Sequence, residues 1–186
     1  MKLTLLKRPS LLFALLALFF LQNNGMHAQK PSFTEALLLE EAGTFNDAVV
    51  KNIVKSDTVV KSIKGPDGKN FQQKVATHYN AGQKIVKTET WNIGTVVKTN
   101  GKRTLYFDGA GKLALEMMND ANGETWLVAF FGYDETGNLS EKRLFDMEHI
   151  FTVHYDGKKQ TYLDARNNKI KNLDKARRAL PYKEKP

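Results

Sequence analysis

Histidine is the first residue to consider for chemistry, because its imidazole binds metals and transfers protons near neutral pH. Beyond residue 28 the chain has three histidines, His78, His149 and His154. His149 and His154 are five residues apart on one predicted strand, so they point to opposite faces and cannot bind one ion together. Asp146 and Glu148 lie near His149, but this spacing fits a polar turn better than a metal-ligand pattern. The sequence therefore predicts no metal and no cofactor.

Two glycine-containing segments resemble ligand-binding loops in part. Asn119–Glu124 contains the Asp-x-Asn-Gly fragment of a calcium loop, but Ala129 stands where the closing carboxylate is required. We interpret this segment as a hairpin turn. Gly109–Lys112 is rich in glycine but is predicted to open a strand, so it offers an anion no helix N-terminus.

The serines and paired carboxylates give no pattern typical of catalysis. Ser32, Ser56, Ser62 and Ser140 lie in neither Gly-x-Ser-x-Gly nor Ser-x-x-Lys. Adjacent carboxylates such as those that begin at Asp134 are expected to be solvated in a turn. The sequence therefore predicts that the protein is not an enzyme. A hydrolase whose carboxylates are far apart in the sequence is the third choice.

Aromatic side chains are the remaining candidates for a binding site. They fall on neighbouring predicted strands, and a curved sheet would bring them onto one surface or around an apolar cavity for a lipid or acyl chain. A packed core is the ordinary use of such residues and is the interpretation that we favour. The candidate ligand-binding residues are Trp91, Tyr106, Trp126, Phe130, Tyr133, Phe151 and Tyr155.

Residues 1–28 have the order of a secretory signal peptide. Lys2, Lys7 and Arg8 precede an apolar run, Leu11–Leu21, and a polar stretch that ends at Ala28. The apolar run is too short to cross a bilayer as a helix. We expect cleavage after Ala28 and export to the periplasm or outer surface of a bacterium; an uncleaved anchor is the alternative. The chain has no cysteine, so export adds no disulfides.

The charge of the chain is only mildly basic once the signal peptide is set aside. The segment carries three basic and no acidic residues, so the formal net charge falls from +8 to +5. The remaining bases are scattered through turns and strand edges, where they hinder pairing with other chains. We therefore expect no nucleic-acid partner. Residues 174–186 are basic, contain Pro181 and Pro186, and are expected to be disordered.

Residues 29–56 are predicted to form two short helices. Ser32–Glu35 fits a capping box, and Gly43 is a suitable end for the first helix. Thr44 can begin a second helix, in which Phe45–Ile53 shows the spacing of a buried stripe. Helices this short cannot bury themselves, so we expect them to pack on one face of the following domain.

Residues 57–173 show the apolar period of two that is typical of strands. Ten or eleven short strands, one of them Thr95–Thr99, are separated by turns such as Gly65–Gly68 and Asn100-Gly101. Connections this short make neighbouring strands antiparallel. The sequence therefore predicts a mostly β protein, an antiparallel meander whose sheet is either open or closed like a barrel.

One phrase occurs twice in this domain, as Phe107-Asp108-x-x-Gly111-x-Leu113 and as Tyr133-Asp134-x-x-Gly137-x-Leu139. With these phrases the chain resembles the YD-type hairpin repeats of RHS-like and wall-associated exported bacterial proteins, over residues 79–170. The resemblance implies a hairpin scaffold or binding surface without a catalytic group. The phrase also has a direct physical explanation. The aromatic residue ends a buried strand, aspartate caps the turn, glycine takes positive φ and leucine re-enters the core.

These observations predict an exported, non-catalytic envelope protein that uses its sheet as a binding or scaffolding surface. An envelope protein, a glycan or a lipid is the expected partner. The alternative is a periplasmic carrier that holds a hydrophobic ligand in a cavity of the sheet, with the helices as a lid.

Overall fold

The computed structural model describes residues 34–64, 68, 70–93 and 101–176. The predicted signal peptide, the predicted strand Thr95–Thr99 and residues 177–186 of the predicted tail lie outside these ranges. The chain divides into two compact units, Met1–Pro31 and Ser32–Pro186, and all described residues belong to the second. Within the described ranges, no helix has both the length and the apolar character needed to cross a membrane.

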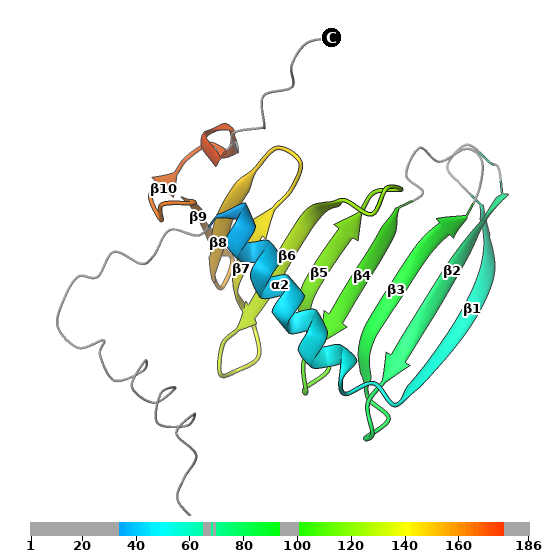
Figure 1. The fold of residues 1–186 in the computed structure, drawn as a ribbon. Coiled ribbons are helices and arrows are strands. Elements are labelled where there is room, and N and C mark those ends of the chain that lie inside the picture. The colour runs from blue at the N-terminus through cyan, green and yellow to red at the C-terminus, as the bar shows by residue number, and fades with distance from the viewer. Residues whose placement is uncertain (1–33, 65–67, 69, 94–100, 177–186) are drawn as a thin grey trace, which may run out of the picture. The chain divides into compact units, whose positions relative to one another are not determined.

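The described residues form one ten-stranded sheet in which each strand pairs with its neighbours in sequence (Figure 1). All pairings are antiparallel. The sheet is open, with β1 and β10 at its edges, so the predicted mostly β meander is confirmed and does not close into a barrel. The strands are β1 (Lys55–Lys64), β2 (Asn70–Tyr79), β3 (Ile85–Ile93), β4 (Lys102–Phe107), β5 (Leu113–Asn119), β6 (Thr125–Tyr133), β7 (Leu139–Phe145), β8 (Ile150–Asp156), β9 (Lys159–Asp164) and β10 (Lys169–Ile170).

The described residues contain one α-helix, α2 (Glu35–Val50), so the prediction of two short helices was wrong. The helix begins after Thr34, whose side-chain oxygen accepts a hydrogen bond from the amide of Leu37, and it continues through Gly43. A glycine inside a helix costs about 1 kcal/mol relative to alanine. An unbroken helix nevertheless keeps one apolar stripe against the sheet, and the burial of that stripe outweighs the cost of the glycine. The stripe consists of Leu38, Ala42, Phe45 and Val49.

The sheet has an apolar cluster on each face. The face that α2 covers, here called the helix face, contributes Tyr106, Leu115, Val128, Phe130 and Phe145 to a cluster with the helix. The opposite face carries a second cluster, which includes Ala176 of the 3₁₀ helix η1 (Leu173–Ala176). Its strand residues are Ala129, Leu144, Phe151, Val153 and Ile170. Strand β6 contributes to both clusters, as its apolar character on both sides predicted.

An ion pair joins α2 to the sheet at the first cluster. The guanidinium group of Arg143 on β7 donates two hydrogen bonds to the carboxylate of Glu41, at 2.9 and 2.7 Å. The same guanidinium lies 5.1 Å from the centre of the Phe130 ring. These contacts fix the middle of the helix over β6 and β7, which leaves β1–β3 beside the helix.

Five turns in the described chain share one hydrogen-bond scheme. In each turn, the amide of the first residue donates a hydrogen bond to the carbonyl of the fifth residue. The amide of the fourth residue donates to the carbonyl of the first, and all these distances are 2.9–3.1 Å. The side chain of the first residue accepts from the fifth amide. The fourth residue has positive φ, 86° at Gly137, where glycine is favoured. The turns are Asn80–Lys84, Asp108–Lys112, Asp120–Glu124, Asp134–Asn138 and Asp164–Asn168. The roles of aspartate and glycine in the repeated phrase are thus confirmed, whereas Leu113 and Leu139 are half-buried and belong to neither apolar cluster.

Three of these turns are linked along one end of the sheet. The ammonium group of Lys84 donates to the carbonyl of Gly109 in the next turn, at 2.9 Å. In the same way, Lys112 donates to the carbonyl of Gly137, also at 2.9 Å. A lysine at the fifth position of a turn therefore connects that turn to its neighbour.

Candidate binding surface

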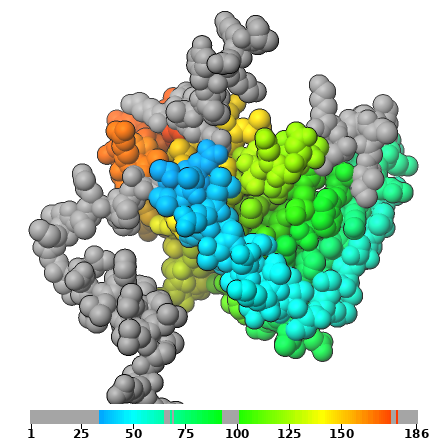
Figure 2. Space-filling view, viewed as in Figure 1, coloured from blue at the N-terminus to red at the C-terminus, as the bar shows by residue number. Residues whose placement is uncertain are grey.

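A polar and basic surface lies on the helix face beside α2, over β1–β4. Direct partners in an antiparallel pair share a face, and Tyr106 beneath the helix is paired with Lys87, which is paired with His78. Atoms of β2–β4 are visible beside α2 in the space-filling view (Figure 2). We call this set the basic surface. Its residues are Ser56, Lys74, His78, Lys87, Glu89, Trp91 and Lys102.

Glu89 is the centre of the basic surface. Its carboxylate accepts hydrogen bonds from His78 Nε2 and from Lys102 Nζ, each at 3.0 Å, and lies 3.4 Å from Lys87 Nζ. Burial by itself raises the pKa of the Glu89 carboxyl. The hydrogen bonds and charges of Lys102, Lys87 and His78 together outweigh it, so the pKa lies below its ordinary value. Glu89 is therefore an ionised anchor for two ammonium groups.

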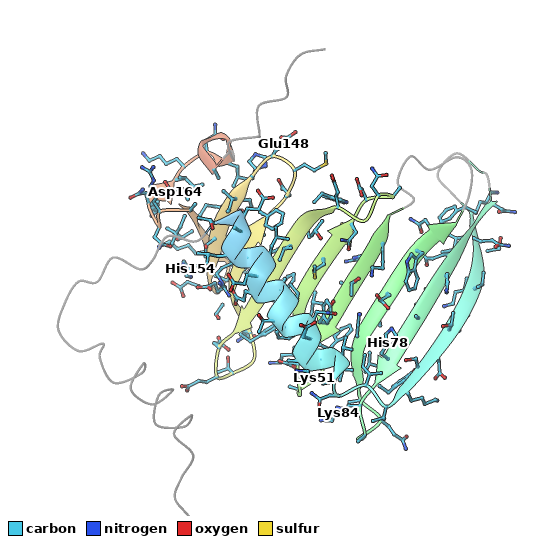
Figure 3. All side chains as sticks on the ribbon, in the orientation of Figure 1. Lys51, His78, Lys84, Glu148, His154 and Asp164 are labelled. Carbon is cyan, nitrogen blue, oxygen red and sulfur yellow. The ribbon has the colours of Figure 1, made fainter. Side chains whose placement is uncertain are left out.

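Ser56 and His78 extend this network to the edge strand. The hydroxyl oxygen of Ser56 lies 2.7 Å from His78 Nδ1. A carboxylate only accepts hydrogen bonds, so in a neutral imidazole Nε2 carries the proton toward Glu89 and Nδ1 accepts from the Ser56 hydroxyl. His78 lies near the C-terminal end of α2, where Lys51 is labelled (Figure 3). The result is a serine–histidine–carboxylate chain across three adjacent strands.

Trp91 lies between two lysines at the next position along these strands. It is paired with Lys74 on β2 and with Lys102 on β4. The Nζ atoms of these lysines lie 5.1 and 6.0 Å from the centre of the indole ring, within the range of a cation–π contact. The indole group therefore holds a positive charge on either side of itself, on a part of the sheet that α2 does not cover.

Helix α2 borders the basic surface through Asn46. The Asn46 side-chain oxygen accepts a hydrogen bond from the Tyr106 hydroxyl at 2.8 Å and lies 3.4 Å from Lys87 Nζ. Burial, followed by the negative charges of Glu89 and Asp47, raises the pKa of the Tyr106 hydroxyl to about 12. Tyr106 is therefore a hydrogen-bond donor that closes one side of the surface.

The seven aromatic residues predicted as candidate ligand contacts are divided between the two faces. Trp91 belongs to the basic surface, whereas Tyr106 and Phe130 are buried beneath α2. Phe151 and Tyr155 pack in the cluster of the opposite face. The remaining two are on β6: Trp126 is half-buried, and Tyr133 donates its hydroxyl to the carbonyl of Leu113 at 2.9 Å. A ligand on one face can contact only some of the seven.

Sequence reasoning did not single out the polar members of the basic surface. The turn at Asn80–Gly82 was a usable signal, because it predicts a hairpin that pairs the strand ending at His78 with the strand containing Glu89. The pairing shifts at His78 and Tyr79, however, and the positive φ falls on Gln83 instead of Gly82. The exact partners could not be derived without this bulge.

Two other segments considered for metal binding form turns. Asp146 accepts hydrogen bonds from the amides of Glu148 and His149, at 2.8 and 2.7 Å. Asp120 accepts from the amides of Asn122 and Glu124, each at 2.9 Å, in the hairpin turn that the sequence predicted. In the part of the chain that the structure describes, no three histidine, aspartate or glutamate side chains are grouped so as to hold a metal ion.

Comparison with family models, with curated proteins and with solved structures found no match to the chain.

Proposed function

We propose that the protein is an exported, non-catalytic binding protein whose basic surface binds an acidic glycan of the bacterial envelope. The observation that carries this proposal is the pair of ammonium groups, Lys74 and Lys102, held beside Trp91 on a part of the sheet that α2 does not cover. Ordered cations lose little conformational entropy when an anion binds to them. A carboxylate-bearing polymer can place one acidic group on each.

The charge and shape of the surface favour such a ligand over a lipid. The surface has three lysines, two beside Glu89 and one beside Trp91, against a single glutamate, so its residues carry a net positive charge. Lipid and acyl ligands require an apolar cavity, whereas the two apolar clusters of the described residues pack as cores, one beneath α2 and one beneath η1 and β10. An open, charged strip suits an extended polymer. The indole edge of Trp91 adds apolar contact to the same strip.

Substitution of Lys74 by alanine tests this proposal. We expect K74A and W91A to weaken the binding of polygalacturonate about tenfold, measured by isothermal titration calorimetry at low ionic strength. Lys142 provides the matched control, because its Nζ lies 5.1 Å from the Phe131 ring on the opposite face. K142A should bind as the unaltered protein does.

The outcome that contradicts the proposal is equal binding of polygalacturonate by K74A and K142A, or equal binding of neutral dextran. Binding should also weaken as salt is added, because at 0.1 M salt the attraction between exposed charges decays over about 10 Å.

A second candidate function is hydrolysis with Ser56 as the nucleophile. It rests on the Ser56–His78–Glu89 chain, with contacts of 2.7 and 3.0 Å. In such a chain histidine takes the hydroxyl proton while serine attacks an ester or amide carbonyl, and it then returns the proton to the leaving group.

A fluorophosphonate probe distinguishes this candidate from binding alone. If Ser56 is an activated nucleophile, the probe will label the protein covalently, and S56A will abolish the label. Ser62 is the control, because it lies on the same strand and the same face; S62A should retain the label. Absence of label on the unaltered protein would reject the hydrolase and leave the binding function in place.

A further inference from the structure

Strand β1 is an unusually long open edge. Among the described residues its ten positions pair on one side only, with β2, and all of them except Ile63 are exposed. Alternate residues of such a strand direct their amide and carbonyl groups away from the sheet, where another strand can bind them. The other edge of the described sheet, β10, has two residues. The capacity for strand addition is therefore concentrated at β1.

The centre of β1 is apolar, although the strand also carries Lys55, Asp57, Lys61 and Lys64. Val59 and Val60 point to opposite faces of the sheet, yet they are 51% and 55% exposed. Thr58 precedes this pair, and Lys61 follows it directly. β-branched residues in a row favour a paired strand. Val59 and Val60 therefore form a short exposed apolar segment in an edge strand that is otherwise polar and charged.

We propose that β1 pairs antiparallel with β1 of a second copy of this chain, with Val59 opposite Val59 of that copy. In this register Asp57 lies opposite Lys61 of the second copy, and the two-fold symmetry creates this ion pair twice. Oppositely charged partners on facing strands stabilise a pair, whereas like charges destabilise it. The sequence of β1 is therefore complementary to itself in this register.

Neighbouring registers lose this complementarity. A shift of one residue in one direction places Lys55 opposite Lys64, and a shift in the other direction places Asp57 opposite Val60. Within one chain Asp57 is 3.0 Å from Lys55, but the two side chains are 48% and 65% exposed, so this contact is weak and can be exchanged. Asp57 is thus available to the second copy.

The symmetry of the pair determines where the two basic surfaces lie. The two-fold axis of an antiparallel strand pair is perpendicular to the sheet, so both helix faces are on the same side. Ser56 of each copy then lies on the shared face near the junction, and the two basic surfaces approach each other from either side of it. An extended polymer could contact both surfaces at once, with a gain in avidity.

Single cysteines test the register, because the chain has none of its own. Facing residues in an antiparallel pair have Cα atoms about 4.5–5.5 Å apart, a separation that a disulfide spans. We expect V59C to form a disulfide-linked dimer under mild oxidation, measured by non-reducing electrophoresis. S62C is the control on the same strand, because Ser62 is exposed and takes no part in the ion pairs, and two copies of residue 62 would be about 20 Å apart along the strands. It should give at least tenfold less dimer.

Charge exchange tests the ion pairs separately from the disulfide. We expect D57K to weaken dimerisation about tenfold in analytical ultracentrifugation, and D57K/K61D to restore it. A chain that sediments as a monomer up to about 100 µM, or equal cross-linking of V59C and S62C, would overturn the proposal. If the chain is a monomer at that concentration, a strand of another protein becomes the candidate partner of the β1 edge. Glycan binding by K74A and K142A can be measured in either oligomeric state, so the two proposals can fail independently.

Discussion

Replacing Phe145 with alanine is expected to lower the free energy of unfolding by about 3–5 kcal/mol. Phe145 is the largest wholly buried side chain of the described residues and lies on the helix face. Its neighbours in the cluster come from both the sheet and α2, among them Leu38 and Val128. The helix and the hydrogen-bonded strands cannot both move inward to fill the space of the ring. The loss therefore includes a cavity as well as the buried apolar surface.

Urea denaturation followed by far-ultraviolet circular dichroism measures this loss. The control is M147A, two residues away, because Met147 is 62% exposed; we expect its effect to be below about 0.5 kcal/mol. A loss below about 1 kcal/mol for F145A would contradict the arrangement described here, since it would mean that α2 does not seal the helix face at this position.

Replacing Glu89 with glutamine is expected to lower the free energy of unfolding by about 2 kcal/mol near pH 7. The substitution keeps the size of the side chain but removes the charge that balances Lys87, which is only 8% exposed. A buried ammonium group that loses its counter-charge is costly. The hydrogen bond from His78 also loses its ionised acceptor.

The pH dependence identifies the cause of this effect. The pKa of Glu89 is lower in the folded protein than its ordinary value of 4.5, so the carboxylate stabilises the fold above that pH. This contribution is lost as the pH falls below 4.5 through the folded pKa. The stability difference between the unaltered protein and E89Q should therefore be constant above about pH 6 and shrink on acidification.

E135Q is the control for these titrations, because Glu135 lies exposed in a turn. We expect it to change the free energy of unfolding by less than about 0.5 kcal/mol at every pH tested. A difference for E89Q that is independent of pH would show that packing, rather than charge, is the contribution of Glu89.

Local sequence signals were sufficient to predict the meander. Alternating apolar residues and Asp-x-x-Gly turns act over fewer than ten residues, and the ten strands of the described chain agree with the ten or eleven that were expected. The helix was misjudged because Gly43 is a local stop signal. It is overridden by the contact of Leu38 and Phe45 with strands far along the chain. Such contacts have no local signature.

The candidate site was less predictable for two physical reasons. Strands such as β6 are apolar on both sides, so the sequence cannot say to which face Phe130 or Phe151 contributes. The Ser56–His78–Glu89 chain depends on pairing among three strands, and one bulge at Tyr79 changes which side chains meet. Residue types alone suggested neither the network nor its position beside α2.

The pairing of each strand with its neighbours in sequence has a consequence for how such a protein can change in evolution. Strands that are adjacent in space are also adjacent in the chain, so the sheet behaves as a nearly one-dimensional array. A duplicated or deleted hairpin then alters two interfaces and leaves the others intact. Contacts between segments far apart in the sequence are concentrated where α2 lies on β6 and β7. The ion pair between Glu41 and Arg143 joins residues that are 102 positions apart. Hairpins outside that region, from β1 to β3, are therefore the units that can be gained, lost or exchanged at least expense to the rest of the fold.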